Sequence, residues 1–203
     1  MKLHANPASP FVRKVRVLAI ETGLEGRIEP TSRPTNPVQP LAELTRDNPI
    51  GKIPCLITDE GAALYDSRVI CEYLDGLHDG PKMFPPSGPA RWTALRRQAL
   101  ADGIMDGGVL ARYETFLRPE ERRWPEWIDN QKEKFQRALD ALEAEDLGET
   151  ADIGTIATGC ALGYLDFRYA AENWRVSRPK LAAWFKTFSR RPSMAKTAPL
   201  EVW

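Results

Sequence analysis

Residues 2–23 read KLHANPASPFVRKVRVLAIETG, and this stretch decides how the first part of the chain folds. Residues 2–5 form a short candidate strand, which a turn-rich Asn6-Pro7-Ala8 follows. Ser9-Pro10 is typical of a helix start, because a serine hydroxyl caps free N–H groups and proline fits the first helical position. Apolar residues then recur at spacings of three and four as far as Gly23. The stretch therefore predicts a strand followed directly by a helix.

Further segments complete the first part of the chain. Residues 28–31 form a second candidate strand, and Leu41–Arg46 form one irregular helical turn. Ile53–Thr58 and Ala62–Tyr65 read as a hairpin, after which Asp66-Ser67 opens another helix. This order of elements predicts an α/β domain, with a small mixed sheet of four strands flanked by helices.

The chain after residue 79 has a different character. Residues 80–88 are rich in proline and glycine and are typical of a linker. The expected helices beyond it cover residues 90–117, 125–146, 151–172 and 179–190, and the tail from Pro192 is expected to be irregular. The third helix is apolar on most sides, as in a helix at the centre of a bundle. We therefore expect an α/β domain over 1–79, the linker, and an all-α domain over 89–203.

The two parts also differ in composition but not in charge. Twelve of the 17 prolines lie in residues 1–89, whereas all six tryptophans lie at or after Trp92. Lys and Arg together number 28, as do Asp and Glu, and neither side of residue 80 has a large excess of one sign. A chain without a basic excess is not expected to bind nucleic acid or an acidic membrane surface.

Compartment and metal content are predicted from what the sequence lacks. It has no apolar run of about 18 residues and no apolar leader at its start, so a cytoplasmic location is expected. Its three cysteines lie far apart and its two histidines are isolated. Neither a disulfide framework nor a metal site is expected from that pattern.

Ser9 is the first candidate for chemistry. A hydroxyl at a helix start lies beside N–H groups without intrahelical partners and beside the positive end of the helix dipole. An anion such as a thiolate is stabilised at such a position. Serine is also a preferred cap of helices in general, so the residue taken alone is explained by capping.

Two more junctions can likewise be interpreted either as ligand-binding or as purely structural. The Ile53-Pro54 bond is a candidate cis peptide, and a proline at a strand start leaves the Ile53 backbone free for an extended ligand. Asp66 and Ser67 offer a carboxylate, a hydroxyl and N–H groups, which suit the two charged groups of an α-amino acid. Taken alone, the first is also explained as a structural proline and the second as a helix cap.

Together these features resemble the cytosolic glutathione S-transferases over essentially the whole chain. The segments that carry the resemblance are Ser9-Pro10-Phe11-Val12-Arg13-Lys14-Val15, Asn48-Pro49-Ile50-Gly51-Lys52-Ile53-Pro54-Cys55-Leu56 and Leu64-Tyr65-Asp66-Ser67-Arg68-Val69-Ile70. The resemblance implies a thioredoxin-like glutathione-binding domain followed by an all-α domain, with glutathione as co-substrate and no metal. The chain is most similar to a bacterial subgroup of serine-type members.

The resemblance also implies roles for single residues. Ser9 would hydrogen-bond the glutathione sulfur, and the thiolate would attack a hydrophobic electrophile. The Ile53 backbone, next to Pro54, would pair with the cysteinyl part, Asp66 and Ser67 would hold the γ-glutamyl end, and Lys52 would reach the glycyl carboxylate. Residues expected at the electrophile site, from helix position only, are Phe11, Met105, Arg112, Tyr113 and Tyr169.

The chain departs from the family pattern at two positions, and more than one function is compatible with its sequence. Related reductases have cysteine at the position of Ser9, so a mixed disulfide is not expected there. Glu149 stands where the family usually has Ser or Thr before the buried helix, so altered capping is expected. The resemblance implies a homodimer. The alternatives are a non-catalytic binding or regulatory protein of this fold, and a glutathione-dependent isomerase, peroxidase or dehalogenase.

Overall fold

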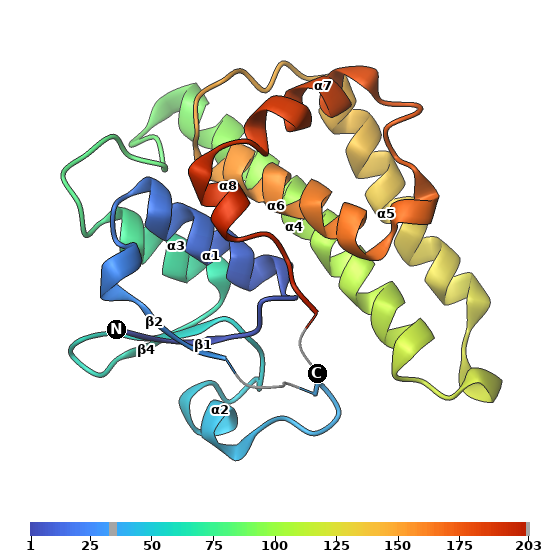
Figure 1. Cartoon of the computed structure of the whole chain (residues 1–203), viewed down its shortest axis with the longest axis horizontal. Helices are drawn as coiled ribbons and strands as arrows, with labels where there is room; N and C mark the ends of the chain where they lie inside the picture. Colours follow the sequence, from blue (N-terminus) through green and yellow to red (C-terminus); the bar gives the residue numbers. More distant parts are fainter. Residues whose placement is uncertain (33–35, 202–203) are drawn as a thin grey trace. The chain divides into compact units, whose positions relative to one another are not determined.

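Figure 1 shows the computed structural model of the chain, which describes residues 1–32 and 36–201. The chain divides into two compact units. The first comprises Met1–Arg91 together with the segment from Pro192, and the second comprises Trp92–Arg191.

The first unit is built on a mixed sheet of four strands. These are β1 (Lys2–Ala5), β2 (Glu29–Ser32), β3 (Cys55–Ile57) and β4 (Ala63–Leu64). Their order across the sheet is β2-β1-β3-β4. β1 is parallel to β2, whereas β3 is antiparallel to both β1 and β4. The sheet predicted from the sequence is confirmed.

Helices cover both faces of this sheet. They are α1 (Pro10–Glu21), α2 (Ala42–Asp47) and α3 (Ser67–Asp75). α1 and α3 lie on one face and α2 lies beyond the other (Figure 1). Alternation along β1 accounts for the two faces, since Leu3 is fully buried whereas the neighbouring His4 is only half-buried.

The core of the first unit lies between the sheet and these two helices. α1 contributes an apolar stripe at helical spacing, and α3 contributes another. The fully buried side chains include Leu3, Val12, Val15, Leu18, Leu56, Ile70 and Leu74. This core holds the ends of α1 and α3 in place against the sheet.

The last part of the chain differs from the prediction. The sequence predicts an irregular tail within the helical domain, but α8 (Pro192–Lys196) is helical and belongs to the first unit, where it packs on α1. Buried Arg13 donates hydrogen bonds to the Met194 carbonyl oxygen at 3.0 Å and to Thr197 Oγ1 at 3.4 Å. The prediction is wrong because these long-range anchors, not the local apolar spacing, determine where the segment packs.

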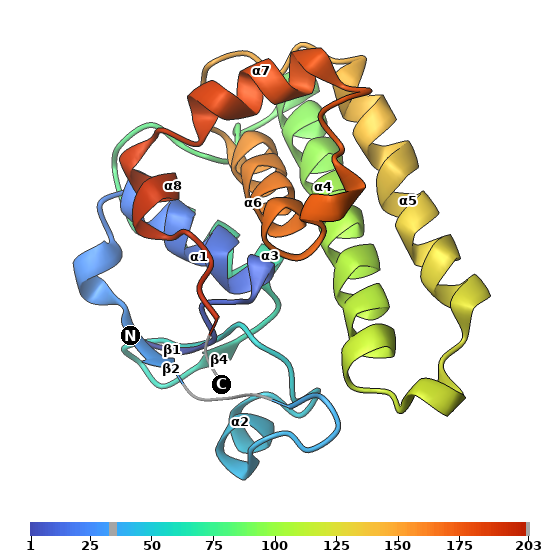
Figure 2. The ribbon, with the colours of Figure 1, turned by 45° about the vertical axis from the view of Figure 1, so that its right-hand side comes forward.

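The second unit is built from helices. α4 (Gly88–Phe116) begins in the first unit, and α5 (Pro125–Glu143), α6 (Ile153–Arg168) and α7 (Pro179–Phe188) follow it. Figure 2 shows α4, α5 and α6 side by side, with α7 across their ends. Short 3₁₀ turns occur at Glu25–Arg27, Glu120–Arg122 and Ala170–Glu172.

α6 is the buried centre of the second unit, as its apolar sequence predicts. Every residue from Ile153 to Leu165 is buried. Gly154 permits close packing on α4, because a Cβ at that position would lie 2.7 Å from the Ala94 carbonyl oxygen. The helix starts with a reciprocal capping box, in which Asp152 Oδ1 accepts from Thr155 N–H and Thr155 Oγ1 accepts from Asp152 N–H, both at 2.8 Å.

Candidate functional site

Three chain junctions meet at one end of the sheet in the first unit. β1 leads into the Ser9 junction, β3 starts directly after Pro54, and β4 ends shortly before Asp66. Because β3 is antiparallel to both neighbours, its start lies beside the ends of β1 and β4. The sheet therefore brings together the three segments that the sequence predicts to be functional.

Ser9 is the N-cap of α1, as the sequence predicts. Its Oγ accepts a hydrogen bond from Val12 N–H at 3.3 Å, which is long for such a bond. The residue is half-buried, and within residues 1–32 and 36–201 its hydroxyl has no acceptor. The hydroxyl can therefore donate to a ligand atom placed at the positive end of α1.

The Ile53-Pro54 peptide bond is cis, which confirms the prediction. The N–H and C=O of Ile53 lie outside the strand ladder and have no hydrogen-bond partner among the residues described. Asn48 fixes the turn before this bond, since its side chain accepts from Ile50 N–H at 3.1 Å and donates to the Lys52 carbonyl oxygen at 2.7 Å. The free edge at Ile53 can pair with an extended, peptide-like ligand.

Asp66 and Ser67 form the start of α3. Asp66 Oδ1 accepts from Arg68 N–H at 2.9 Å, so the predicted cap is confirmed. The Tyr65-Asp66 bond is also cis, which the sequence does not predict. Ser67 is only 2% exposed, yet its hydroxyl has no partner in the described part of the chain. A nearly buried hydroxyl without a partner is suited to bind a ligand, because leaving it unpaired costs about 1–3 kcal/mol.

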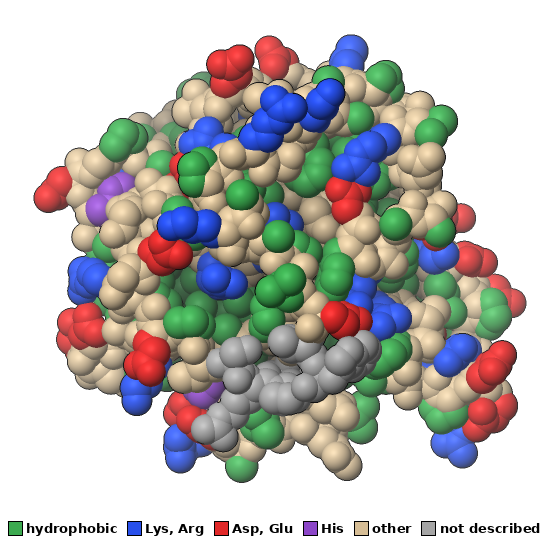
Figure 3. Space-filling model, viewed as in Figure 1, with side chains coloured by type: hydrophobic (Ala, Val, Ile, Leu, Met, Phe, Trp, Pro, Cys, Tyr) green, Lys and Arg blue, Asp and Glu red, His purple; other side chains and the backbone are tan. Residues whose placement is uncertain are grey.

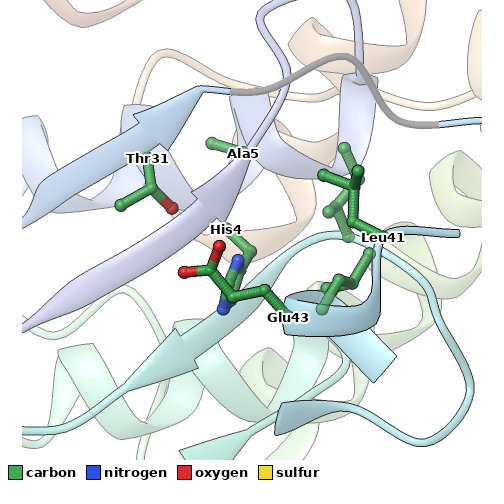
Figure 4. Close-up of a pocket in the computed structure, with 7 residues that line it drawn as sticks. His4, Ala5, Thr31, Leu41 and Glu43 are labelled. Carbon is green, nitrogen blue, oxygen red and sulfur yellow. The ribbon is translucent and has the colours of Figure 1, made fainter. Parts of the chain in front are cut away.

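A pocket adjoins Ile53 on the α2 side of the sheet (Figure 4). Its lining residues are His4, Ala5, Thr31, Leu41, Glu43, Leu44 and Ile53. One lining residue, His4, has its Nε2 2.7 Å from Asp47 Oδ2, and this contact connects β1 to the end of α2. The hydrogen bond from His4 lowers the pKa of the Asp47 carboxyl below its usual value. Lys52, the remaining predicted ligand group in this region, is exposed.

The chain's own cysteines are poorly placed to react. All three are buried, and burial raises the pKa of Cys55, the residue after Pro54, to about 11. This thiol therefore stays protonated at neutral pH. Cys55 is therefore poorly suited to act as a nucleophile at this edge of the sheet.

The residues expected at the electrophile site are placed less uniformly. Phe11 is half-buried in the first turn of α1, with Lys14 Nζ 5.9 Å from its ring centre. Met105 is 0% exposed in α4, so its side chain presents no surface to a ligand. The sequence selects Met105 by its position on the helix, which does not reveal that this face is packed against neighbouring helices.

The other three expected residues lie in the second unit, on the last part of α4 or directly after α6. Arg112 and Tyr113 follow Gly108 on α4, and the Tyr169 hydroxyl donates to the Gly108 carbonyl oxygen at 2.6 Å. Tyr164 joins them, with its ring centre 6.5 Å from that of Tyr169. The sequence does not single out Tyr164, because the residue is one of many buried residues of an apolar helix. The signal that could have identified it is a polar hydroxyl within that apolar helix.

The surface charge agrees with the zero net charge of the sequence. Figure 3 shows Lys and Arg side chains interspersed with Asp and Glu on the face in view. In the described residues, no helix combines the length and the apolar character needed to cross a membrane. The same residues contain no group of three or more His, Cys, Asp or Glu side chains arranged to hold a metal ion.

Two family profiles match the chain. The profile described as "Glutathione S-transferase, N-terminal domain" matches residues 8–77, and "Glutathione S-transferase, C-terminal domain" matches residues 125–187. The chain is also 36% identical over 204 residues to "Uncharacterized GST-like protein YibF" of Escherichia coli K12, with 98% of both chains covered.

Solved structures extend the similarity to the whole fold. One is a glutathione transferase family member from Pseudomonas fluorescens Pf-5 with bound glutathione, which is 51% identical with a TM-score of 0.96. That match covers 98% of this chain and 99% of the other. A second structure from the same organism, with bound S-(propanoic acid)-glutathione, is 49% identical with a TM-score of 0.91 and covers 99% and 100% of the two chains.

Proposed function

Because the chain belongs to the glutathione S-transferase family, we propose that it binds glutathione at this edge of the sheet and joins the glutathione sulfur to the carbon of an electrophile. The glutathione bound to the Pseudomonas relative supports the choice of ligand. The exposed edge at Ile53 and the two helix starts are the groups of this chain that would receive it.

The observation that carries the proposal is the Ser9 hydroxyl at the start of α1. In the complex it donates a hydrogen bond to the glutathione sulfur and favours thiolate over thiol. A free thiol has a pKa of about 8.5, and lowering it by about 2 units takes roughly 2.7 kcal/mol. A hydrogen bond to an anion, together with the dipole of α1, supplies a stabilisation of that order.

The remaining groups fit the two ends of the tripeptide. The Ile53 N–H and C=O pair with the cysteinyl residue, which keeps the sulfur beside Ser9. Asp66 binds the ammonium of the γ-glutamyl end, and Ser67 with the N–H groups of α3 binds its carboxylate. Lys52 directly precedes Ile53, so its long side chain can reach the glycyl carboxylate of a tripeptide that pairs with Ile53.

The reaction is substitution or addition at carbon. The thiolate forms a sulfur–carbon bond, and either the leaving group departs or the added electron pair takes up a proton from solvent. The relative with bound S-(propanoic acid)-glutathione supports this class of product, because its substituent is on the sulfur. Ser9 has no sulfur with which to form a mixed disulfide, which favours conjugation over thiol–disulfide exchange.

Replacement of Ser9 tests the proposal. Ser9→Ala is expected to lower kcat for conjugation of 1-chloro-2,4-dinitrobenzene about 100-fold, because a hydrogen bond to the reacting anion is lost. Glutathione affinity, measured by calorimetry, is expected to fall only about threefold, since contacts to the rest of the tripeptide remain. Ser9→Thr keeps both the hydroxyl and the cap and is the matched control. A wild type without binding heat, or a Ser9→Ala variant with wild-type kcat, would overturn the proposal.

A further inference from the structure

The second unit carries a cluster of polar aromatic side chains around one arginine. Gly108 and Arg112 are one turn apart on the same face of α4. The Tyr169 hydroxyl donates to the Gly108 carbonyl oxygen, and the Tyr164 ring lies so close that a Cβ at Gly108 would be 3.0 Å from its edge. α4 and the end of α6 therefore place Arg112, Tyr113, Tyr164 and Tyr169 together.

Arg112 is a cation without an anionic partner in this cluster. Its guanidinium lies 4.0 Å from the centre of the Phe116 ring, and the residue is half-buried. No Asp or Glu of residues 1–32 and 36–201 forms an ion pair with it. The nearby carboxylate of Glu172 is already paired with Lys132 Nζ at 2.5 Å. The guanidinium thus keeps N–H donors in a geometry that matches a carboxylate.

Two tyrosine side chains of this cluster lack hydrogen-bond partners for their hydroxyls among the described residues, and the charge of Arg112 acts on the Tyr164 hydroxyl. Tyr164 is only 4% exposed and Tyr113 is 41% exposed, and neither hydroxyl bonds to any residue within the described ranges. Burial raises the pKa of Tyr113 and of Tyr164, so both hydroxyls keep their protons at neutral pH. They are therefore hydrogen-bond donors, which an anion needs and an apolar ligand does not.

We propose that Arg112, together with the hydroxyls of Tyr113 and Tyr164, binds the carboxylate of an anionic second substrate on the second unit. The inference rests on the proposed glutathione transfer and names the class of electrophile that this chain prefers. It departs from the hydrophobic electrophile that the resemblance to the family implies.

A matched pair of aryl chlorides tests the charge directly. The probes are 4-chloro-3-nitrobenzoate and 4-chloro-3-nitrobenzamide, which differ in the group opposite the chlorine. In both, the sulfur–carbon bond forms, the carbon–chlorine bond breaks, chloride leaves and the thiol proton passes to solvent. The kcat/KM of each is divided by its uncatalysed rate constant with glutathione, which removes the difference in intrinsic reactivity.

The expected result is a loss of preference for the anion in Arg112→Gln. The normalised kcat/KM for the benzoate falls about 10- to 100-fold, and the loss for the benzamide is at least about tenfold smaller. Arg112→Lys keeps the charge and retains part of the preference. Arg137→Gln, a change at an exposed arginine of α5, leaves the ratio of the two probes unaltered.

Two outcomes overturn the inference. One is a benzoate-to-benzamide ratio that is the same in wild type and Arg112→Gln. The other is the absence of calorimetric binding of 4-chloro-3-nitrobenzoate to wild type. A chain that conjugates neither probe counts against the proposed function itself and leaves the anion site to be decided by binding. In that case calorimetry with 4-chloro-3-nitrobenzoate alone decides: binding that Arg112→Gln weakens about tenfold supports the anion site, and absence of binding to wild type contradicts it.

Discussion

The starts of α1 and α6 are both N-capped helix ends, but they use their caps differently. At α6, Asp152 and Thr155 satisfy each other's backbone N–H groups through two hydrogen bonds of 2.8 Å. At α1, Ser9 Oγ accepts one bond of 3.3 Å from Val12 N–H, and its hydroxyl proton has no acceptor in the part of the chain that is described. The cap of α6 satisfies its own hydrogen-bonding groups, whereas the cap of α1 leaves a hydroxyl donor available for a ligand.

This difference separates a structural cap from a candidate binding cap. Both residues are of types that cap helices well, so residue type alone does not distinguish them. What distinguishes them is where the unused groups lie. Ser9 shares its edge of the sheet with the Ile53 backbone and the Ser67 hydroxyl, and neither of these has a hydrogen-bond partner among residues 1–32 and 36–201. Asp152, in contrast, opens a helix that is buried along most of its length.

In the comparison of the two caps, the largest change in a rate is expected when Ser9 is given a nucleophile of its own. In Ser9→Cys, the introduced thiolate would attack the disulfide of oxidised glutathione, form a new sulfur–sulfur bond and release one glutathione thiolate. We expect this adduct, measured by mass spectrometry at pH 6, to form about tenfold faster than in Ser189→Cys, because a helix start favours a thiolate. Ser189 is the C-cap of α7, where the dipole has the opposite sign. Equal rates in the two variants would break the comparison.

A smaller effect is expected when the complete cap is removed. Asp152→Ala should lower the free energy of unfolding by about 1–2 kcal/mol, as measured by urea denaturation, because the capping box loses its acceptor. Conjugation by the folded variant should stay within about twofold of wild type, since Asp152 has no part in binding. Glu149→Ala, at an exposed position before the same helix, is the control and should cost less than about 0.5 kcal/mol. A loss of turnover in folded Asp152→Ala would remove the distinction between the caps.

The smallest effect concerns the segment that leads to Ile53. The hydrogen bond from His4 lowers the pKa of Asp47, so its stabilisation is present at neutral pH and is lost as the pH falls through the lowered pKa of Asp47. We expect His4→Gln to destabilise the protein by about 1 kcal/mol at pH 7, with a smaller difference below about pH 4. Chemical denaturation at several pH values measures this. The same difference at every pH would contradict the assigned role, and a cycle with Asp47→Asn isolates the pair.

The sequence predicts the α1 junction well because its information is local. Ser9-Pro10, Ile53-Pro54 and Asp66-Ser67 owe their conformations to capping and proline chemistry, which act over two or three residues. The alternation along β1 and the apolar stripe of α1 predict the sheet and its cover for the same reason.

Features that depend on packing are not predicted from the sequence. Arg13 anchors α8 through a contact between residues far apart in the chain, and no local pattern predicts it. Tyr164 has the same limitation, since only the packing of α6 against α4 shows that its ring lies against Gly108, one helical turn before Arg112. Met105 is the converse case, a residue chosen by helix position that the packing buries completely.

The central claim is that Ser9 favours the thiolate of bound glutathione, and the pKa of that thiol tests it most directly. Ultraviolet absorbance of the thiolate, followed against pH with saturating glutathione, gives this pKa for wild type and for Ser9→Ala. We predict a value about 2 units below that of free glutathione in wild type and a rise of at least about 1 unit in the variant. A bound thiol with the same pKa in both proteins, or with the pKa of free glutathione in wild type, would contradict the account.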